Sequence, residues 1–240
     1  MFKISHIPQM VLTLGCGFVI KADNINVRMV KTPNYLMKII DQVLKQRILN
    51  NIDQMVDRNL QFAYLNDCNR MDMVGTIIQH WPEHKKSTLF KLDISKAFDT
   101  VNAGVALKKI QKYCDISTFY LLVSVMSERW LKINKERQNW YCKENQGVPQ
   151  GTAIGPLLFI IALDEPLRQI SQKGIFIKSY ADDIVIITRK PPQEILSLAS
   201  EVMQTINLKL NHEKTETYSY NSLGKGEVEI LARHCGHLIC

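Results

Sequence analysis

Two adjacent carboxylates, Asp182 and Asp183, stand between two short apolar runs of the chain. The runs cover 175–177 and 184–187, which predicts a tight turn between two buried strands. Like charges held this close raise each other's pKa, and a divalent cation bound by both side chains would remove that cost. Asp-Asp is also favourable turn chemistry, so the pair alone does not decide between a metal site and a plain turn.

A third carboxylate, Asp93, lies near the end of another apolar run, 89–94. If this strand lies beside the Asp-Asp turn, three carboxylates offer the hard oxygen ligands that Mg²⁺ prefers. In two-metal chemistry the ions sit ~3.5–4 Å apart and bind both the attacking and the leaving oxygen. The alternative is that Asp93 caps the turn that follows it, although Asp99 is better placed for that structural role.

A glycine-rich segment, 146–152, runs into an apolar stretch of helical character. Glycine lets a backbone lie close against a ligand, and the first amides of a helix are free to bind one. An ordinary loop followed by a helix cap explains this segment equally well.

The rest of the pattern predicts the elements that would position these residues. Strands are expected over 11–21, 26–30, 89–94, 174–180 and 184–189, with a surface hairpin over 132–146 and strand-like runs near 208–211 and 228–239. Helices are expected over 32–48, 71–80, 102–113, 117–131, 151–171 and 191–206. The first helix should have Pro33 at its first position and bury a stripe of Leu36, Ile39, Ile40, Val43, Leu44 and Ile48. The fold class is therefore α+β, with an antiparallel sheet covered by helices on one face.

Three segments resemble, in this order, the successive catalytic motifs of reverse transcriptases. They are FKLDISKAFDTV at 90–101, QGVPQGTAIGPLLF at 146–159 and SYADDIVI at 179–186. More narrowly, the segments resemble those of LINE-type (non-LTR) retrotransposons, and LKLNHEKTETYS at 208–219 resembles a segment of the same family. It continues upstream through VRMVKTP, KIIDQVLKQRI and QFAY, so that it covers nearly the whole chain from about residue 18.

The resemblance implies an RNA-directed DNA polymerase, a nucleotidyltransferase that adds dNTPs to a primer 3′-hydroxyl by a two-metal mechanism. Its partners would be an RNA template and a DNA or RNA primer, and its cofactors two Mg²⁺ ions or Mn²⁺. Asp93, Asp182 and Asp183 are similar to the metal-binding triad, with the Ile94 carbonyl as a further ligand. Lys214 resembles the lysine that protonates the leaving pyrophosphate.

The same resemblance implies a nucleotide pocket and a primer site. Phe98 stands where the family has an aromatic steric gate that rejects a ribose 2′-hydroxyl. Other residues resemble those that bind the triphosphate (Lys21 and Arg28), the nucleotide and template (Gln150 and Gly151) and the primer (Cys235, Gly236 and His237).

The right-hand polymerase architecture follows from this resemblance. Fingers are expected over 1–88 and 115–146, and palm over 89–114 and 147–222. A primer-grip hairpin is expected over 223–240, with the helical thumb missing beyond it. Without a thumb, the grip on primer and template should be poor.

Composition agrees with a polyanionic partner. Lys and Arg number 30 against 23 Asp and Glu, a net charge of +7. The six cysteines lack C-x-x-C spacing and are expected to be free thiols; His234, Cys235, His237 and Cys240 are zinc-ligand types, but a second half-site is missing. No apolar run reaches the ~20 residues of a membrane helix. We therefore expect a soluble intracellular protein, nuclear if it comes from a eukaryotic retroelement, with no membrane partner.

Other interpretations stay open from the sequence. The chain could be a bacterial reverse transcriptase of the group II intron or retron type, or, less in keeping with Tyr-Ala-Asp-Asp at 180–183, a viral RNA-dependent RNA polymerase. It could also be a truncated, inactive remnant that folds and binds nucleic acid without polymerising. The sequence does not determine the oligomeric state.

Overall fold

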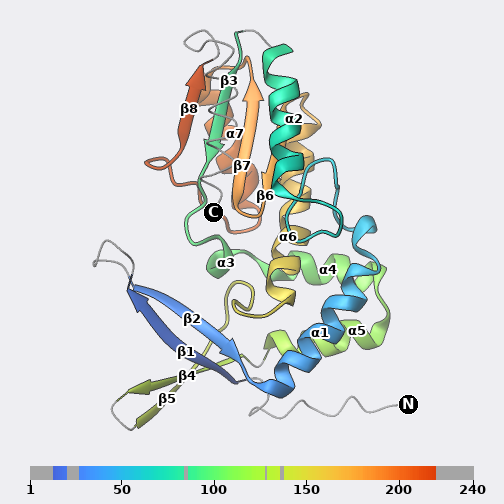
Figure 1. Cartoon of the computed structure of the whole chain (residues 1–240), viewed down its shortest axis with the longest axis vertical. Helices are drawn as coiled ribbons and strands as arrows, with labels where there is room; N and C mark the ends of the chain where they lie inside the picture. The colour runs from blue at the N-terminus through green and yellow to red at the C-terminus, as the bar shows by residue number, and fades with distance from the viewer. Residues whose placement is uncertain (1–12, 21–26, 84–85, 128, 136–137, 220–240) are drawn as a thin grey trace. The chain divides into compact units, whose positions relative to one another are not determined.

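The computed structural model describes residues 13–20, 27–83, 86–127, 129–135 and 138–219. The chain divides into two compact units (Figure 1). The first consists of Met1–Met55 and Phe98–Phe159, and the second of Val56–Ala97 and Ile160–Cys240. These boundaries differ from those expected for fingers and palm, and that assignment stays a prediction.

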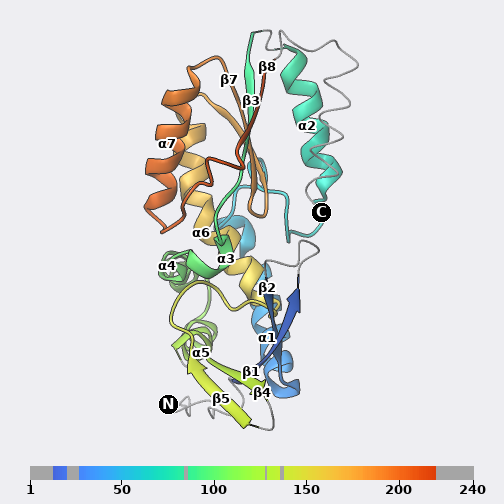
Figure 2. The same cartoon turned by 90° about the vertical axis from the view of Figure 1, so that its left-hand side faces the viewer.

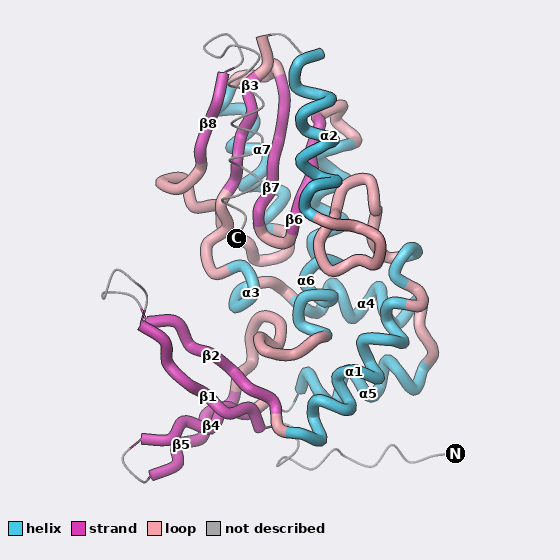
Figure 3. The backbone as a smooth tube through the Cα atoms, viewed as in Figure 1, coloured by secondary structure: helices cyan, strands magenta, loops and turns pink. Residues whose placement is uncertain are grey.

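The first unit contains a four-stranded sheet in the order β2-β1-β4-β5. The predicted N-terminal hairpin is present as β1 (Thr13–Ile20) and β2 (Val27–Pro33), and the surface hairpin as β4 (Trp130–Lys135) and β5 (Gln138–Lys143). Strands within each hairpin are antiparallel, whereas β1 and β4 pair in parallel and so join the two hairpins. Figure 3 shows both hairpins in magenta.

The helices of the first unit largely follow the predicted ranges. They are α1 (Tyr35–Leu49), the 3₁₀ turn η1 (Ile52–Gln54), α4 (Ala103–Tyr113) and α5 (Ile116–Ser127). A single turn, α3 (Ala97–Thr100), was not predicted. Asn102 caps α4 as expected, because its Oδ1 accepts a hydrogen bond from the Gly104 amide at 3.0 Å.

Helix α1 differs from its prediction at its start and in the stripe that it buries. Its N-cap is Asn34, whose side chain accepts from the Met37 amide at 2.8 Å, while Pro33 ends β2. The buried residues are Met37, Asp41, Leu44 and Ile48. The prediction was wrong for Leu36, Ile39 and Val43, which are 57%, 49% and 41% exposed.

The reason for this rotation is Asp41, a carboxylate only 3% exposed. Its two oxygens accept hydrogen bonds from the amides of Ala153 and Ile154, at 2.5 and 2.9 Å. These amides stand at the start of α6 (Ile154–Ser171), where the helix itself supplies no acceptor. Burial raises the pKa of Asp41, and the two amide hydrogen bonds oppose that rise. A polar contact across the fold therefore decides which face of α1 is buried.

Asp41→Ala is expected to lower the free energy of unfolding by about 2 kcal/mol, because two amides at the start of α6 lose their acceptor. Urea denaturation followed by circular dichroism measures this loss. Gln42→Ala is the matched control, since Gln42 is an exposed neighbour on the same helix and its replacement should change the value by less than about 0.5 kcal/mol. A loss in Asp41→Ala as small as that in Gln42→Ala would show that water replaces the carboxylate without cost.

The second unit is built on a four-stranded antiparallel sheet in the order β6-β7-β3-β8. The predicted strands are present as β3 (Thr88–Leu92), β6 (Phe176–Tyr180) and β7 (Asp183–Thr188). The fourth strand, β8 (Glu216–Ser219), was not predicted. In the segment before β8, the expected strand near 208–211 is reduced to a single bridge between Ile94 and Leu210.

Helices cover both faces of this sheet, so the expectation of a single covered face was wrong. Figure 2 shows α6 and α7 (Pro192–Gln204) on one side and α2 (Arg70–Glu83) on the other. The cause is visible in β7, where the four residues 184–187 are all buried, so both faces of the strand need cover. On the α2 side the core consists of Phe62, Met73, Val74, Ile77, Trp81, Leu89, Val185 and Ile187.

Two further expectations can be compared with the described part of the chain. Its cysteines, Cys16, Cys68, Cys114 and Cys142, are free thiols, as predicted. Within the same ranges, no helix has both the length and the apolar composition needed to cross a bilayer.

Candidate active site

The Asp182–Asp183 pair lies at the turn between β6 and β7, as the sequence indicated. Tyr180 pairs with Asp183, which leaves Ala181 and Asp182 as a two-residue loop. Ala181 has φ 56°, a left-handed conformation that a residue with a Cβ adopts only at a cost of about 1 kcal/mol. Strain of this kind collects at functional sites, where the surrounding structure holds it in place. Ala181 directly precedes the two carboxylates in the chain.

Asp93 comes to the same end of the sheet. Leu92, the last residue of β3, pairs with Ile184, so Asp93 directly after it stands beside the start of β7, where Asp183 lies. The segment after α7 holds this strand end in place: the Asn211 amide donates to the Asp93 carbonyl at 2.8 Å, and the Ser95 amide to the Lys209 carbonyl at 2.9 Å. The three carboxylates that the sequence singled out thus lie at one end of one sheet.

The pKa of Asp183 is affected by the nearby carboxylates. Its pKa is raised from 3.8 to about 6, first by burial, then by the negative charge of Asp182 and, more weakly, of Asp93. Lys91 and Arg70 oppose the rise without cancelling it. Burial and the two neighbouring carboxylates together therefore disfavour the ionised form of Asp183.

These residues suit a divalent cation in their chemistry. Carboxylate oxygens are hard ligands, and a bound cation would remove the repulsion that raises the pKa of Asp183. Within the described residues, however, no three His, Cys, Asp or Glu side chains are so arranged that they could hold a metal ion. The gathering of the carboxylates is observed, and the two-ion site stays a prediction.

Two residues near the carboxylates were missed by the sequence interpretation. Tyr64, the last residue of QFAY, has a left-handed backbone conformation with φ 61°. Its pKa is raised by partial burial and then by the charge of Asp182. The guanidinium of Arg70 lies 5.3 Å from the ring centroid of Tyr180. Tyr64 lies in the QFAY segment, which was noted only for its resemblance to the family, whereas no pattern in the sequence marks Arg70.

The segment that carries Tyr64 is anchored along β6. The Phe62 amide donates to the Ser179 carbonyl at 3.1 Å, and the Ser179 amide to the Leu60 carbonyl at 2.8 Å. Between them the buried Gln61 side chain donates to the Ile160 carbonyl at 3.0 Å. This segment therefore extends the sheet next to the hairpin that presents Asp182.

The predicted nucleotide-pocket residues belong to the first unit. Phe98 is half-buried and stacks on Phe159, with ring centroids 4.6 Å apart and planes 22° from parallel. The Gln150 side chain donates to Asp99 at 2.8 Å. Gly151 has φ 80°, and a Cβ there would lie 1.9 Å from the Lys31 carbonyl oxygen, so only glycine fits.

Of the remaining predicted residues, Lys214 and Arg28 lie within the described part of the chain. Lys214 is exposed, and its amide donates to the Asn211 carbonyl at 3.2 Å. Arg28 lies in β2 opposite Val19. Lys21 and the primer-grip residues Cys235, Gly236 and His237 lie outside the described residues, as do His234 and Cys240 of the possible zinc cluster.

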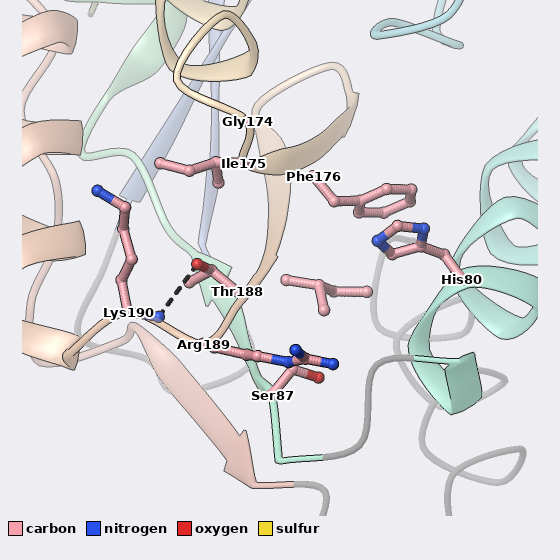
Figure 4. Close-up of a pocket in the computed structure, with 9 residues that line it drawn as sticks. His80, Ser87, Gly174, Ile175, Phe176, Thr188, Arg189 and Lys190 are labelled. Carbon is pink, nitrogen blue, oxygen red and sulfur yellow. Dashed lines mark hydrogen bonds between the residues drawn. The ribbon is translucent and has the colours of Figure 1, made fainter.

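A cavity of about 540 Å³ opens at the other end of the sheet in the second unit (Figure 4). It is lined by His80, Ser87, Gly174, Ile175, Phe176, Ile187, Thr188, Arg189 and Lys190. His80 stacks on Phe176 with ring centroids 3.8 Å apart, and the Lys190 amide donates to Thr188 Oγ1 at 3.2 Å. Phe176 begins β6 and Thr188 ends β7, whereas the carboxylates lie where β6 ends and β7 begins. The cavity is thus separate from the candidate active site.

Comparison with known proteins decides the family. The family model described as reverse transcriptase (RNA-dependent DNA polymerase) matches residues 19–233. The chain belongs to the reverse transcriptase family. This confirms the resemblance drawn from the three motifs and makes the chain a member of a nucleotidyltransferase family.

Curated relatives narrow the resemblance to non-LTR retrotransposons. The Pol polyprotein of the R2DM element of Drosophila melanogaster is 25% identical over 220 residues, which are 85% of this chain and 20% of that protein. The RNA-directed DNA polymerase of the mobile element jockey of Drosophila funebris is 26% identical over 172 residues, which are 65% of this chain and 19% of that protein. The chain thus spans about a fifth of the length of these relatives.

A solved structure supports the predicted fold. Apo telomerase from Candida tropicalis, truncated from the C-terminal domain, superposes with a TM-score of 0.67. The match covers 88% of this chain and 50% of that one, at 14% identity. At this identity the likeness concerns the fold alone, and it confirms the α+β class.

Proposed function

We propose that this chain is the RNA-directed DNA polymerase core of a non-LTR retrotransposon, which copies an RNA template by adding dNTPs to a primer 3′-hydroxyl. One observation carries the proposal: Asp93, Asp182 and Asp183 gather at one end of an antiparallel sheet. They do so in a chain that the reverse transcriptase model matches over 19–233. The positive net charge of +7 supports a nucleic-acid partner.

Each carboxylate has a role in this proposal. Asp93, Asp182 and Asp183, with the Ile94 carbonyl, would hold two Mg²⁺ or Mn²⁺ ions, which when bound lower the pKa of the primer 3′-hydroxyl and neutralise the triphosphate. The 3′-oxygen attacks the α-phosphorus and pyrophosphate leaves. The charges of Asp182 and Asp93, which with burial raise the pKa of Asp183, favour a bound cation at this end of the sheet.

Lys214 is proposed as the general acid for pyrophosphate, donating a proton from its Nζ. Backbone hydrogen bonds support the assignment. The Lys214 amide donates to the Asn211 carbonyl, and the Asn211 amide donates to the Asp93 carbonyl. The exposed ammonium therefore belongs to a turn that is tied to the end of β3.

The other roles come from the family. Phe98 would exclude ribonucleotides, Gln150 and Gly151 would line the nucleotide pocket, and Lys21 and Arg28 would bind the triphosphate, Arg28 bidentately. Cys235, Gly236 and His237 would contact the primer. The fingers and palm ranges given above remain part of this proposal.

Primer extension tests the function. With poly(rA)/oligo(dT), dTTP and Mg²⁺, the chain is expected to lengthen the primer, and Asp182→Ala to yield no product. Binding of primer–template without extension, at high concentrations of protein and of primer–template, would contradict the proposal and favour a remnant that only binds nucleic acid. Extension that persists in Asp182→Ala would place catalysis elsewhere.

A further inference from the structure

Four charged side chains of alternating sign form a connected row in the first unit: Arg129, Glu144, Lys31 and Asp99. Arg129 Nη1 lies 3.5 Å from Glu144 Oε2, Lys31 Nζ is paired with Glu144 Oε1, and Lys31 Nζ lies 3.7 Å from Asp99 Oδ1. Lys31 and Arg129 are 4% and 3% exposed, whereas the Asp99 side chain is 48% exposed. The row thus leads from the interior of the unit to one carboxylate at the surface.

The exposed end of the row holds Gln150. The same Oδ1 of Asp99 that faces Lys31 accepts a hydrogen bond from Gln150 Nε2 at 2.8 Å. A carboxylate can only accept hydrogen bonds, so it selects the amide orientation that turns Nε2 toward it. The Gln150 Oε1 then remains on the other side of the amide, where it can accept a hydrogen bond from a ligand.

Asp99 does not have the turn-capping role that the sequence suggested for it. The cap of the following helix is Asn102, and the contacts of the Asp99 carboxylate reach Lys31 on β2 and Gln150 in the glycine-rich loop. These partners lie far away in the sequence, which is why no local pattern revealed them.

The backbone of the glycine-rich loop is held by contacts that do not involve the Asp99 side chain. The Val148 amide donates to the Phe98 carbonyl at 2.9 Å, and Arg129 Nη2 to the Gln146 carbonyl at 3.0 Å. Gly151 lies directly against the Lys31 backbone. Removing the Asp99 carboxylate should therefore release the Gln150 side chain and leave the loop in place.

We propose that Asp99 is a positioning residue, which sets the orientation of the Gln150 amide toward the incoming nucleotide. Lys31, which is buried and paired with the partly exposed Glu144, fixes the position of the Asp99 carboxylate, and Asp99 in turn orients Gln150. The inference rests on the proposed function, in which Gln150 lines the nucleotide pocket.

A double-mutant cycle in single-nucleotide primer extension tests the proposal. Asp99→Ala is expected to raise the KM for dTTP about tenfold while kcat changes less than about twofold, since a charge-assisted hydrogen bond that orders the pocket is lost. Asp99→Ala combined with Gln150→Ala should be no worse than Gln150→Ala alone. Asp99→Asn, whose Oδ1 can still accept from Gln150, should recover part of the loss.

Additive effects in the cycle would overturn the proposal, because Asp99 would then act independently of Gln150. So would an unchanged KM in Asp99→Ala. Glu201→Ala, which removes an exposed carboxylate on α7, is the control and should leave both constants unchanged.

A second measurement does not need polymerase activity. The side-chain amide signals of Gln150 in a ¹⁵N-labelled chain are assigned by their loss in Gln150→Ala. They should shift in Asp99→Ala and stay in place in Glu201→Ala. Unmoved signals would overturn the proposal whatever the enzyme does. If the signals shift in Asp99→Ala but the wild-type chain extends no primer, the proposed function is rejected, and with it any nucleotide role of Asp99.

Discussion

Asp183→Asn is expected to abolish primer extension, by roughly 10³-fold or more, and at the same time to raise the thermal stability of the metal-free chain at pH 8. The first effect follows from the loss of a carboxylate of the proposed triad. The second follows from the pKa of Asp183, which is raised to about 6 by burial and by the charges of Asp182 and Asp93. Its ionised form therefore destabilises the folded state, and the neutral amide of Asn does not.

The direction of the pH dependence follows from linkage. Because the folded pKa of about 6 lies above the ordinary value of 3.8, the folded state binds the proton more tightly than the unfolded state. The contribution of Asp183 to stability thus falls as the pH rises from about 4 to about 6, and the penalty is complete above that range. Solvent screening of this half-buried group reduces its size but not its sign.

Thermal melts in EDTA at pH 5 and pH 8 measure this effect. The melting temperature of Asp183→Asn relative to wild type should be higher at pH 8 than at pH 5. Glu201→Gln on α7 is the control, and it should show no such difference. A variant that melts below wild type at pH 8 would mean that Asp183 takes part in a stabilising contact, and that burial and carboxylate repulsion do not make its ionised form unfavourable.

Features with a local cause could be predicted from the sequence. The β6–β7 hairpin follows from two apolar runs around Asp182 and Asp183, and the cap of α4 follows from Asn102. Strand β8 has no such signal, because Glu216–Ser219 is polar and becomes a strand only by pairing with β3. The buried stripe of α1 was predicted only in part, at Leu44 and Ile48, because the partners of Asp41 lie more than 100 positions later in the chain.

In the candidate site, too, residues with a local sequence signal could be predicted and residues placed by tertiary contacts could not. Its carboxylates lie directly beside the ends of apolar strands and could be named from that pattern and from the family motifs. Arg70 and Tyr64 influence the carboxylates only because α2 and the segment before it pack beside β6, a tertiary arrangement that no local spacing encodes. Asp99 was assigned to the wrong role because its partners, Lys31 and Gln150, are brought to it by the fold.

Phe98→Val is expected to lower the selectivity for dTTP over UTP about 100-fold in single-nucleotide extension, as the ratio of the two kcat/KM values. Phe98 stacks on Phe159, which fixes the ring, and a fixed ring can reject a ribose 2′-hydroxyl by steric clash. Valine is too short to make that clash, so the gain should appear in the use of UTP, while kcat/KM for dTTP changes less than about fivefold.

The stacking on Phe159 also gives Phe98 a packing role, and the two roles must be separated. Phe98→Tyr keeps the ring and should keep the selectivity. Phe98→Val should also lose about 1–2 kcal/mol of stability, because an aromatic stack and part of its buried area are removed. A variant that loses this stability yet still rejects UTP would show that Phe98 belongs to the core alone. In that case another side chain of the nucleotide pocket would have to read the sugar.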